Sequence, residues 1–559
     1  MFLGIDVGTT NVKAGVLSEV GRLLSVAREP TPTLRPQARW AEHPADELWA
    51  CVVRVCRRAM AGLAEAGDAR ERGTRSAGGG PAEAGRLGTV RLEAVGIAGM
   101  AEAGLLIDAH SEPLTPLLAW FDGRGEHEAK AWLEPEVARR TWLETGVLPS
   151  TKVPLIKLQW LARHRPAALE SAWKWLHAPD FVAYRLTGEA ATSPSLACRT
   201  MAFSLLERKW SAELLSRAGI DASIMPFVVD ETSAVGRISA LAASQLGLPE
   251  GIPVVIAGHD HACGAAGAGV DSPSNVLDSL GTAETLLRPL EHLGAHDSVI
   301  TEAARGSRAA EQSRSTGQRS EGYNYGCRVS GGYYEMAGLS SSGGTFAWWA
   351  SKLRAGRSSV EATPRPESDG PSGQDLQEVV AAGAHLASLV TDRPSGLLAL
   401  PYLDGSGPPQ KDPVARGALL GLHRGHNKAD LLLAVIEGLA CESRRMLEGM
   451  AALPEEVTAI GGGTGNEIWL QTKADVMNLP IRVPATSESV LVGAGTAAAI
   501  ATGHFSGFDD VGREEGRVVL PHPERSLDYD DWFRRVYRPA VEAYRELDAL
   551  VRSGSGVGA

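Results

Sequence analysis

The spacing of hydrophobic and polar residues predicts strands at the start of the chain. Residues 2–7 are an apolar run, and the turn-forming sequence Gly-Thr-Thr-Asn follows almost directly. Every second residue is then apolar from Val12 to Val16, which is typical of a half-buried strand. We therefore expect a β-hairpin here, continued by a further strand over 23–27.

The rest of the first half alternates helical and extended patterns. Apolar residues recur at helical spacing over 40–63, and amphipathic helices dominate 149–219. Short apolar runs predict strands at 91–97, 104–108 and 253–257, and the last leads directly into Gly-His-Asp-His. The side chains expected in the core of this half are Leu48, Val52, Val55, Ala59, Trp160, Trp173, Trp175 and Phe181.

The second half begins its own pattern of strands and glycine-rich turns. A strand over 277–282 ends in a small-residue turn, and a long helix is expected over 429–450. A strand at 457–460 leads into Gly-Gly-Gly-Thr-Gly and then into a helix over 466–477. Two halves that each pair strands with glycine-rich turns predict an α/β chain.

Stretches rich in Gly, Ser, Arg, Glu and Pro interrupt this pattern. We expect unstructured surface insertions at 66–88, 293–321 and 354–374. The tail from Arg552 ends in Ser-Gly-Ser-Gly-Val-Gly-Ala and should also be mobile.

Length, charge and cysteine content narrow the classes of function. A chain of 559 residues should form more than one domain. Lys and Arg number 55 against 67 Asp and Glu, and the resulting charge of −12 has the wrong sign for a nucleic-acid partner. The six cysteines are scattered, as in reduced cytosolic proteins, and no apolar run suits a signal peptide or a membrane span. We expect a cytoplasmic protein.

The first hairpin turn has the chemistry of a phosphate site. Gly8 allows an oxyanion to approach the backbone, while Thr9 and Thr10 offer hydroxyl and amide donors. Lys13 adds a cation. Asp6 would repel phosphate unless a divalent cation lies between them, as in Mg-nucleotide sites. An ordinary tight hairpin is the alternative interpretation.

Two turns of the second half have related chemistry. Asp-Ser-Leu-Gly-Thr-Ala-Glu over 278–284 resembles the first turn, so a ligand held between two phosphate-binding turns, one from each half, is expected. The glycine-rich turn over 461–466 lies between a strand and a helix, where bare backbone suits a ribose or a flat ring. It lacks the third glycine of a dinucleotide fingerprint, so a generic strand-to-helix turn is the alternative. The chain has no P-loop motif.

The last strand of the first half ends in His259-Asp260-His261-Ala-Cys263. A structural zinc site needs four ligands, and no second pair of ligands is evident, so zinc is the weaker interpretation. Asp260 is better placed as a general base, because it follows an apolar strand and a glycine. A buried aspartate that caps a helix is the alternative.

These features, in this order, resemble the FGGY carbohydrate kinases of the sugar kinase, chaperone and actin superfamily. The resemblance extends from Phe2 to about Gly503 and includes Trp120-Phe-Asp122-Gly-Arg124, Asp412-Pro-Val-Ala-Arg-Gly417 and Gly493-Ala-Gly-Thr-Ala497. It implies two actin-like (ribonuclease H-like) domains with ATP and sugar in the cleft between them. The expected boundaries are 1–268 for the sugar- and phosphate-binding domain, 269–510 for the nucleotide-binding domain, and 511–559 for a C-terminal helical extension with a mobile tail.

The resemblance also implies ATP-dependent phosphorylation of a sugar or polyol hydroxyl, with ATP and Mg²⁺ as cofactors. It makes Asp260 the catalytic base. It also associates both Asp6 and Asp260 with the metal. The implied contacts to the ATP phosphates are Gly8, Thr9, Thr10, Lys13, Gly281, Thr282 and Gly343. The implied contacts to adenosine are Gly462, Gly463 and Asn466.

The implied substrate loop departs from the best-known patterns of the family. Gly99-Met-Ala-Glu102 lies where xylulokinases typically show Gln-Met-His and glycerol kinases Gln-Arg-Glu. Glu102 agrees with the glycerol kinase pattern, whereas Ala101 agrees with neither, so neither assignment follows. We expect Glu102 to accept hydrogen bonds from two adjacent hydroxyls, beside Asp260 and His261. Lys152 is the fourth expected contact. If it faces the substrate, a carboxylated sugar becomes plausible, whereas a snorkelling surface lysine is the alternative.

Two interpretations compete with an active kinase. One is a nucleotide-gated, non-catalytic actin-like or chaperone-like protein, and the other is a degenerate kinase that senses sugar. The presence of Asp6 and Asp260 favours the enzyme, as does Trp120-x-Asp122-x-Arg124. The expected partner is a small sugar or polyol. Neither nucleic acid nor a membrane is expected, and a homodimer is one option.

Overall fold

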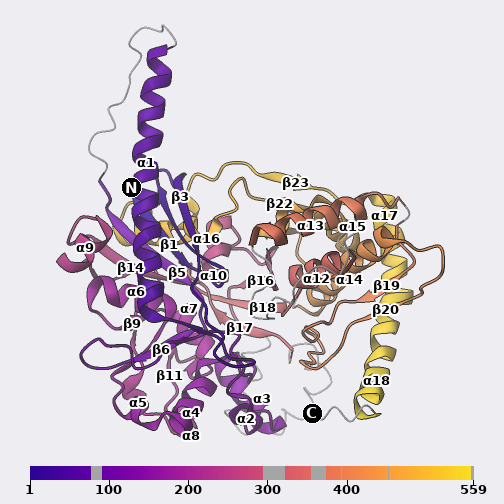
Figure 1. The fold of residues 1–559 in the computed structure, drawn as a ribbon, viewed down its shortest axis with the longest axis horizontal. Coiled ribbons are helices and arrows are strands. Elements are labelled where there is room, and N and C mark those ends of the chain that lie inside the picture. Colours follow the sequence, from indigo (N-terminus) through magenta and orange to yellow (C-terminus); the bar gives the residue numbers. More distant parts are fainter. Residues whose placement is uncertain (77–90, 294–321, 354–372, 392, 451, 555–559) are drawn as a thin grey trace, which may run out of the picture.

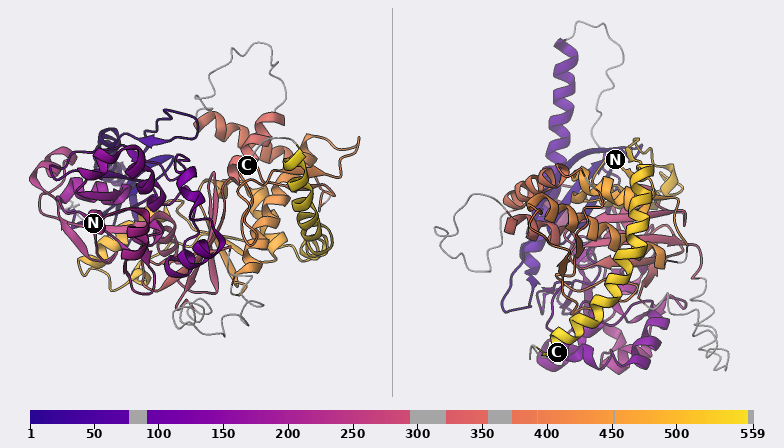
Figure 2. Two further views of the ribbon diagram at one scale, coloured as in Figure 1. Left: turned by 90° about the horizontal axis from the view of Figure 1, so that it is seen from below. Right: turned by 90° about the vertical axis from the view of Figure 1, so that its right-hand side faces the viewer.

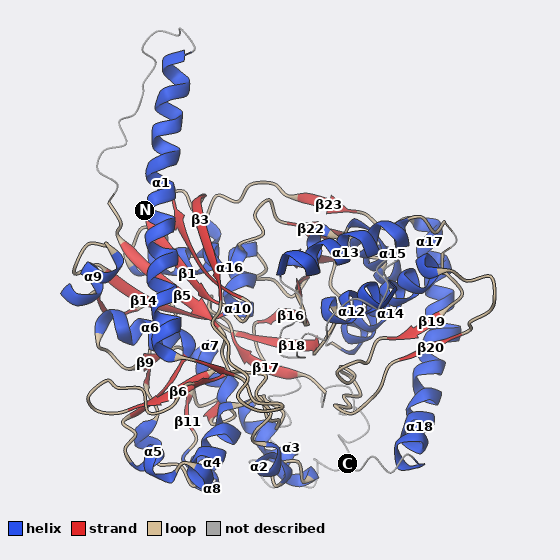
Figure 3. Cartoon of the chain, viewed as in Figure 1, coloured by secondary structure: helices blue, strands red, loops and turns tan. Residues whose placement is uncertain are grey.

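Two β-sheets, one from each half of the chain, organise the protein (Figure 1). The computed structural model describes residues 1–76, 91–293, 322–353, 373–391, 393–450 and 452–554. Figure 3 shows helices packed around both sheets.

The first half is built on a sheet with the strand order β13-β14-β5-β1-β2-β3. β1, β2 and β3 form an antiparallel meander, β5 and β14 run parallel to β1, and β13 is antiparallel to β14. The expected hairpin and third strand are therefore confirmed. The strands are β1 (Phe2–Val7), β2 (Asn11–Leu17), β3 (Leu23–Pro30), β5 (Ala94–Gly99), β13 (Ala234–Arg237) and β14 (Pro253–His259).

Helices and smaller sheets complete the first half: α1 and α6 pack on the first sheet, whereas α2, α4 and α8 pack around a separate core. The helices are α1 (Ala45–Ser76), α2 (Glu126–Lys130), α3 (Pro135–Thr145), α4 (Pro154–His164), α5 (Pro166–Glu170), α6 (Ala178–Thr187), α7 (Pro194–Ala197), α8 (Ala212–Ala218), α9 (Ala240–Leu246) and α10 (Asp260–Ala268). The shorter strands are β4 (Glu42–His43), β6 (Gly104–Ile107), β7 (Leu117–Leu118), β8 (Lys174–His177), β9 (Ala191–Thr192), β10 (Phe203–Ser204), β11 (Lys209–Trp210) and β12 (Phe227–Val228).

The second half repeats the arrangement of the first. Its sheet has the order β17-β18-β16-β15-β21-β22-β23, with an antiparallel meander on one side of β15. On the other side, β21 and β22 run parallel to β15, and the edge strand β23 is antiparallel to β22. The strands are β15 (Asn275–Leu280), β16 (Glu284–Leu290), β17 (Asn324–Cys327), β18 (Tyr333–Leu339), β21 (Glu456–Ile460), β22 (Ile481–Val483) and β23 (Arg517–Val519), and a separate pair is β19 (Leu398–Leu400) and β20 (Ala418–Leu420). The helices are α12 (Gly343–Leu353), α13 (Gly373–Ser388), α14 (Lys428–Gly449), α15 (Glu467–Met477), α16 (Ser489–Ala501), α17 (Pro523–Trp532) and α18 (Arg538–Gly554).

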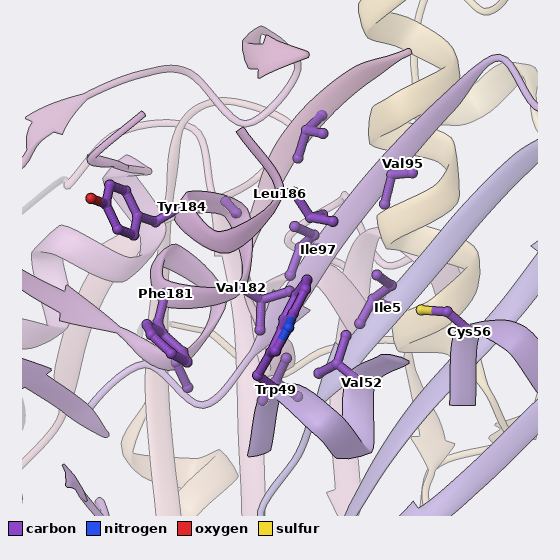
Figure 4. Close-up of a cluster of buried hydrophobic side chains, with 14 of the residues drawn as sticks. Ile5, Trp49, Val52, Cys56, Val95, Ile97, Phe181, Val182, Tyr184 and Leu186 are labelled. Atoms are coloured by element: carbon purple, nitrogen blue, oxygen red, sulfur yellow. The ribbon is translucent and has the colours of Figure 1, made fainter. Parts of the chain in front are cut away.

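The core of the first half lies between the sheet and helices α1 and α6 (Figure 4). Ile5 and Ile97 from the sheet meet Val52 from α1 and Val182 from α6. The helical spacing predicted this face correctly, because Leu48, Val52, Val55 and Ala59 are all buried. Among the four aromatic residues expected in the core, Trp173 is the exception. It is 39% exposed because it precedes strand β8 at the surface.

Helix α16 comes from the second half of the chain but packs on the first sheet. It contacts β1, β5 and α10. Glycines make this packing close: a Cβ at Gly96 of β5 would lie 1.8 Å from the carbonyl oxygen of Ala494. From the helix side, a Cβ at Gly493 would lie 2.1 Å from the carbonyl oxygen of Cys263. The small residues of α16 thus bring three backbones into direct contact.

The C-terminal helices pack on the second half at the end remote from the first sheet (Figures 1 and 2). Tyr529 and Phe533 join a core with Tyr402 of the β19–β20 region. The expected tail from Arg552 needs correction, because α18 continues to Gly554 and Arg552 pairs with Asp412 at 3.0 Å. Residues 555–559 lie outside the described residues.

The expected insertions also need correction at one point. Helix α1 continues to Ser76 and extends beyond the sheet in Figure 1, and so includes residues 66–76 of the stretch expected to be unstructured. Alanine, glutamate and arginine in this segment are good helix formers, so the composition did not exclude a helix. The rest of that stretch (77–88) and almost all of the other two (294–321 and 354–372) lie outside the described residues.

Two segments cross the expected domain boundaries at 268 and 510. Helix α16 lies on the first sheet, and β23 forms an edge strand of the second sheet beside β22. The boundaries themselves stay predictions.

Candidate active site

Three acidic residues gather where the parallel strands of the first sheet end. Asp6 is near the end of β1, Glu102 follows β5, and Asp260 follows β14. The register aligns Val7 with Gly99 and Gly99 with His259, so the three carboxyl ends lie side by side. This edge of a parallel sheet is where α/β proteins place their ligands.

Asp6 is buried and lies in a field of mixed charges. Burial raises the pKa of Asp6 to about 7; Lys13 opposes the shift, while Asp260 and Glu488 add to it. Its Oδ1 atom has no hydrogen-bond partner among the described residues. The Asp6 carboxylate is therefore costly to leave charged without a nearby cation.

Lys13 reaches across to the second half of the chain. It pairs with Asp6 in the β1–β2 register, and its Nζ lies 3.9 Å from Asp6 Oδ2. It donates a 2.7 Å hydrogen bond to Glu488 Oε2, at the start of α16. Lys13 is thus close to the phosphate-type turn, as expected, but Glu488 already offsets its charge.

Asp260 begins helix α10, and its side chain remains partly exposed. Its Oδ1 lies 3.2 Å from His259 Nε2 and accepts the backbone N–H of His261 at 2.7 Å. Burial lowers the pKa of His259 to about 4, so this imidazole is neutral near pH 7. His259, Asp260 and His261 could offer three metal ligands, but no fourth ligand joins them in the described part of the chain.

Glu102 is held by a buried arginine. Arg199, in the turn after α7, donates from Nε and Nη2 to Glu102 Oε1 at 2.9 and 2.7 Å. Burial would raise the pKa of Glu102, but Arg199 and His259 outweigh it and bring the pKa to about 2. Lys157 donates to the Glu102 backbone carbonyl at 2.7 Å, which fixes the loop. Glu102 is a carboxylate at any physiological pH.

Lys152 connects the two halves. Its Nζ donates to Ser340 Oγ at 3.2 Å, just before α12, and lies 4.9 Å from the ring centroid of Trp120. The Trp120 indole in turn donates to Thr9 Oγ1 at 2.8 Å. Lys152 is therefore half-buried beside the first phosphate-type turn, and it is not a snorkelling lysine on an outer surface.

The second phosphate-type turn joins β15 to β16 and packs against the start of α12. The backbone N–H groups of Ser342 and Gly344 donate to Thr282 O at 2.9 and 3.0 Å. A Cβ at Gly343 would lie 2.4 Å from Gly281 O, so only glycine allows this approach. Gly281, Thr282 and Gly343 are thus brought together, as the sequence predicted.

The glycine-rich turn after β21 adjoins the same place. Gly461 has φ +92°, and a Cβ there would lie 2.6 Å from Leu280 O, immediately before Gly281. A Cβ at Gly462 would meet nothing within 4 Å. Asn466 caps α15 by accepting the Trp469 N–H, and its Nδ2 is buried without a partner among the described residues. Gly463 also packs on Leu280, so both turns form one surface.

A buried ion cluster lies under these turns and was not expected from the sequence. Lys473 Nζ is 2.6 Å from both Asp278 and Glu284, and Glu284 accepts from Ser342 Oγ at 2.7 Å. The cluster links α15 to both ends of the β15–β16 turn. Arg199 and Ser340 were missed as well, because no short motif contains them and each contacts a partner distant in sequence.

Comparison with known proteins identifies the family of this site. The pattern described as "FGGY family of carbohydrate kinases, N-terminal domain" matches residues 1–267, and its C-terminal counterpart matches residues 308–502. The chain belongs to the FGGY family of carbohydrate kinases. It is an enzyme of the phosphotransferase class that acts on an alcohol group of a sugar or polyol.

Relatives match this FGGY kinase over nearly its full length. The xylulose kinase of Bacillus subtilis (strain 168) is 25% identical over 99% of this chain and 98% of its own. The glycerol kinase of Bordetella parapertussis is 26% identical over 97% of this chain and 96% of its own. The crystal structure of ligand-bound xylulose kinase from Lactobacillus acidophilus has a TM-score of 0.78 at 19% identity, covering 98% of this chain and 99% of that one.

These findings confirm the expected family, the fold of two actin-like domains and the assignment as an enzyme. They favour the kinase over a filament or chaperone. None of the described helices is both long and apolar enough to span a membrane. The roles of individual site residues stay predictions.

Proposed function

We propose that the protein transfers the γ-phosphoryl group of Mg-ATP to a hydroxyl of a sugar or polyol, with Asp260 as the general base. The observation that carries this proposal is the convergence of Asp6, Glu102 and Asp260 at the ends of three adjacent parallel strands. Asp6 and Asp260 lie in different environments, which suits metal binding and proton transfer. Glu102 is held in place by Arg199, which suits the recognition of hydroxyl groups.

The residues present fit a divalent cation. Asp6 is buried, its Oδ1 has no hydrogen-bond partner among the described residues, and the charge of Asp260 raises its pKa further. Hard cations such as Mg²⁺ prefer carboxylate oxygens and retain water ligands. Asp6 and Asp260 would hold the ion, and its charge would relieve the repulsion between them.

The turns of both halves fit ATP. Gly8, Thr9 and Thr10 would bind phosphate from the first half, with Lys13 beside them, and Gly281, Thr282 and Gly343 from the second. Adenosine would lie on the backbone of Gly462 and Gly463, of which Gly462 has nothing within 4 Å of its Cβ position, and the Nδ2 of Asn466, without a partner among the described residues, offers a donor. When bound, Mg-ATP would supply the transferable phosphoryl group and the cation that offsets its charge.

Asp260 would accept the proton of the attacking hydroxyl at a carboxylate oxygen. His259 lies 3.2 Å from its Oδ1 and fixes its orientation, while the backbone of His261 donates to the same atom. Glu102 would accept hydrogen bonds from neighbouring hydroxyls, because Arg199 occupies its Oε1 and leaves Oε2 for the substrate. Positioning and charge neutralisation account for most of phosphoryl-transfer catalysis.

The test is ADP release from Mg-ATP over a panel of ketoses, aldoses, polyols and sugar acids, with mass spectrometry of the product. We expect ADP release that depends on one substrate class and yields a phosphorylated sugar. Nucleotide binding without any phosphorylated product would instead indicate the degenerate sensor, and it would overturn the proposal.

A further inference from the structure

Lys152 lies between the two phosphate-type turns. Its Nζ donates to Ser340 Oγ at 3.2 Å, and Ser340 lies two positions before the backbone N–H that donates to Thr282 O in the second turn. On its other side, the ammonium is 4.9 Å from the ring centroid of Trp120, whose indole donates to Thr9 Oγ1 in the first turn at 2.8 Å. The ammonium therefore has one of these turns on each side, and the side chain is half-buried rather than enclosed.

The other lysines at these turns are already paired with carboxylates. Lys13 donates to Glu488 at 2.7 Å, and Lys473 lies 2.6 Å from each of the two acidic residues of the second turn. Lys152 differs from both, because within the described residues its partners are a hydroxyl and an aromatic ring, and it forms no ion pair. Such partners stabilise an ammonium less than an anion does.

The segment that carries Lys152 also contacts the loop expected to hold the sugar. Helix α4 begins two residues later, and its Lys157 donates to the backbone carbonyl of Glu102 at 2.7 Å. Burial lowers the pKa of Lys152, and the more distant charge of Glu102 opposes the shift. That carboxylate is already bound by Arg199, so an anion placed beside Lys152 would stabilise its ammonium further.

The contacts favour a phosphoryl group as this anion. In the proposed reaction the γ-phosphoryl group crosses from the nucleotide turns to a hydroxyl held at the Glu102 loop, whereas the β-phosphate stays with the nucleotide. A carboxylated sugar is the competing anion. Lys152 contacts residues that belong to the turns or bond to them, while Lys157 and Arg199 contact the Glu102 loop. The position of Lys152 therefore suits the group in transfer better than the remote end of the sugar.

We propose that the ammonium of Lys152 binds the γ-phosphoryl group while it passes from ATP to the sugar hydroxyl. This inference rests on the proposed kinase function and adds a residue to its machinery. Asp260 would take the hydroxyl proton as the hydroxyl oxygen bonds to the γ-phosphorus, and the bond from that phosphorus to the β-phosphate oxygen breaks with its electron pair leaving on ADP. Lys152 would keep its own proton and offset the charge on the oxygens of the phosphoryl group.

Nucleotide binding to the full-length protein tests the contact without turnover. Titration calorimetry with Mg²⁺ would compare ADP with the β,γ-imido analogue of ATP (AMP-PNP), which retains the terminal phosphate. Lys152→Met keeps the apolar stem and removes the charge. We expect it to raise the Kd for AMP-PNP about 10-fold and the Kd for ADP less than about twofold, because ADP lacks the group that the lysine contacts. Lys152→Arg should retain part of the preference for AMP-PNP.

Turnover gives a second measurement on the same variants. In ADP-release assays Lys152→Met should lower kcat about 10- to 100-fold and leave the KM for the sugar near the wild-type value. An increase in the KM for the sugar with AMP-PNP binding unchanged would assign the lysine to the substrate and overturn the proposal. Equal losses of affinity for AMP-PNP and ADP, or a variant that behaves like wild type, would overturn it as well.

Two control variants separate a phosphoryl contact from a structural bridge. Ser340→Ala removes the hydrogen bond between the halves but keeps the ammonium, so the preference for AMP-PNP over ADP should persist. If Ser340→Ala abolishes that preference as Lys152→Met does, the bridge is the cause and the proposal is wrong. Lys130→Met, at an exposed lysine on α2, should bind both nucleotides like wild type. A wild-type protein that phosphorylates no compound of the panel would count against the proposed function, whereas the AMP-PNP and ADP titrations would still decide the Lys152 contact.

Discussion

Replacing Gly96 by alanine should separate helix α16 from the first sheet. Gly96 lies in the middle of β5, where β1 and β14 pair with it on either side. An added Cβ would lie 1.8 Å from Ala494 O and 2.6 Å from Ala494 C. Because real Cβ contacts essentially never fall below 3.0 Å, the helix would have to move by at least the difference, 1.2 Å.

The structure sets the magnitude of this effect. The obstructing atoms are backbone, so no rotamer change can relieve the contact, and the sheet is fixed on both sides. Overpacking of a core costs about 1–3 kcal/mol, and we expect the upper part of that range, less ~0.5 kcal/mol because alanine restricts the unfolded chain. For a domain of this size, the resulting loss of about 1.5–2.5 kcal/mol corresponds to a fall in Tm of roughly 3–10 °C.

The assay is thermal unfolding of Gly96→Ala, wild type and a matched glycine variant at one scan rate. Gly507→Ala is the control, because its backbone is extended at φ −167° and a Cβ there would meet nothing within 4 Å. A Tm for Gly96→Ala within about 2 °C of Gly507→Ala would refute the close packing of α16 on β5.

Three further predictions concern charged groups. Glu102→Gln should lower kcat/KM for the sugar about 10- to 100-fold and spare the KM for ATP; equal losses for both would contradict its substrate role. Asp6→Asn should raise the Mg²⁺ concentration needed for half-maximal turnover, and an unchanged requirement would count against it. Burial raises the pKa of Glu437 from 4.5 to about 7. Between these two pH values the native state keeps a proton that the unfolded chain loses, so the free energy of unfolding falls as the pH rises from 4.5 to about 7. In denaturant unfolding, the free energy of unfolding should fall less between pH 5 and pH 8 for Glu437→Gln than for wild type. An identical fall in both proteins would disprove this role of Glu437.

Local patterns predicted the strands and turns well because the information lies within a few residues. The alternation after Gly8 forms β2, and the glycines at 461–463 form the turn after β21. The residues of the second half that were expected to contact ATP lie together because the strands of one sheet end at the same edge. Gly281, Thr282 and Gly343 therefore lie together although Gly343 is 62 positions after Gly281.

Features that depend on distant partners were not predictable in this way. Arg199 is recognisable as part of the site only through Glu102, which lies 97 residues away. Helix α16 is uniformly small and apolar, so its sequence gives no sign that it packs on the sheet of the other half. Trp173 is the opposite case. Its aromatic side chain was expected in the core, but it is exposed in the structure.

The central claim is that Asp260 removes the proton from the attacking hydroxyl, and Asp260→Asn tests it most directly. Asparagine preserves the size of the side chain and its contact with the His261 backbone, so folding should persist. We expect kcat to fall by about 10²–10⁴-fold while the Kd for ATP stays near the wild-type value, since loss of a general base affects the chemical step. Asp528→Asn, at an exposed position on α17, is the matched control. A kcat for Asp260→Asn within about threefold of wild type would contradict the account, because a general base contributes far more than that.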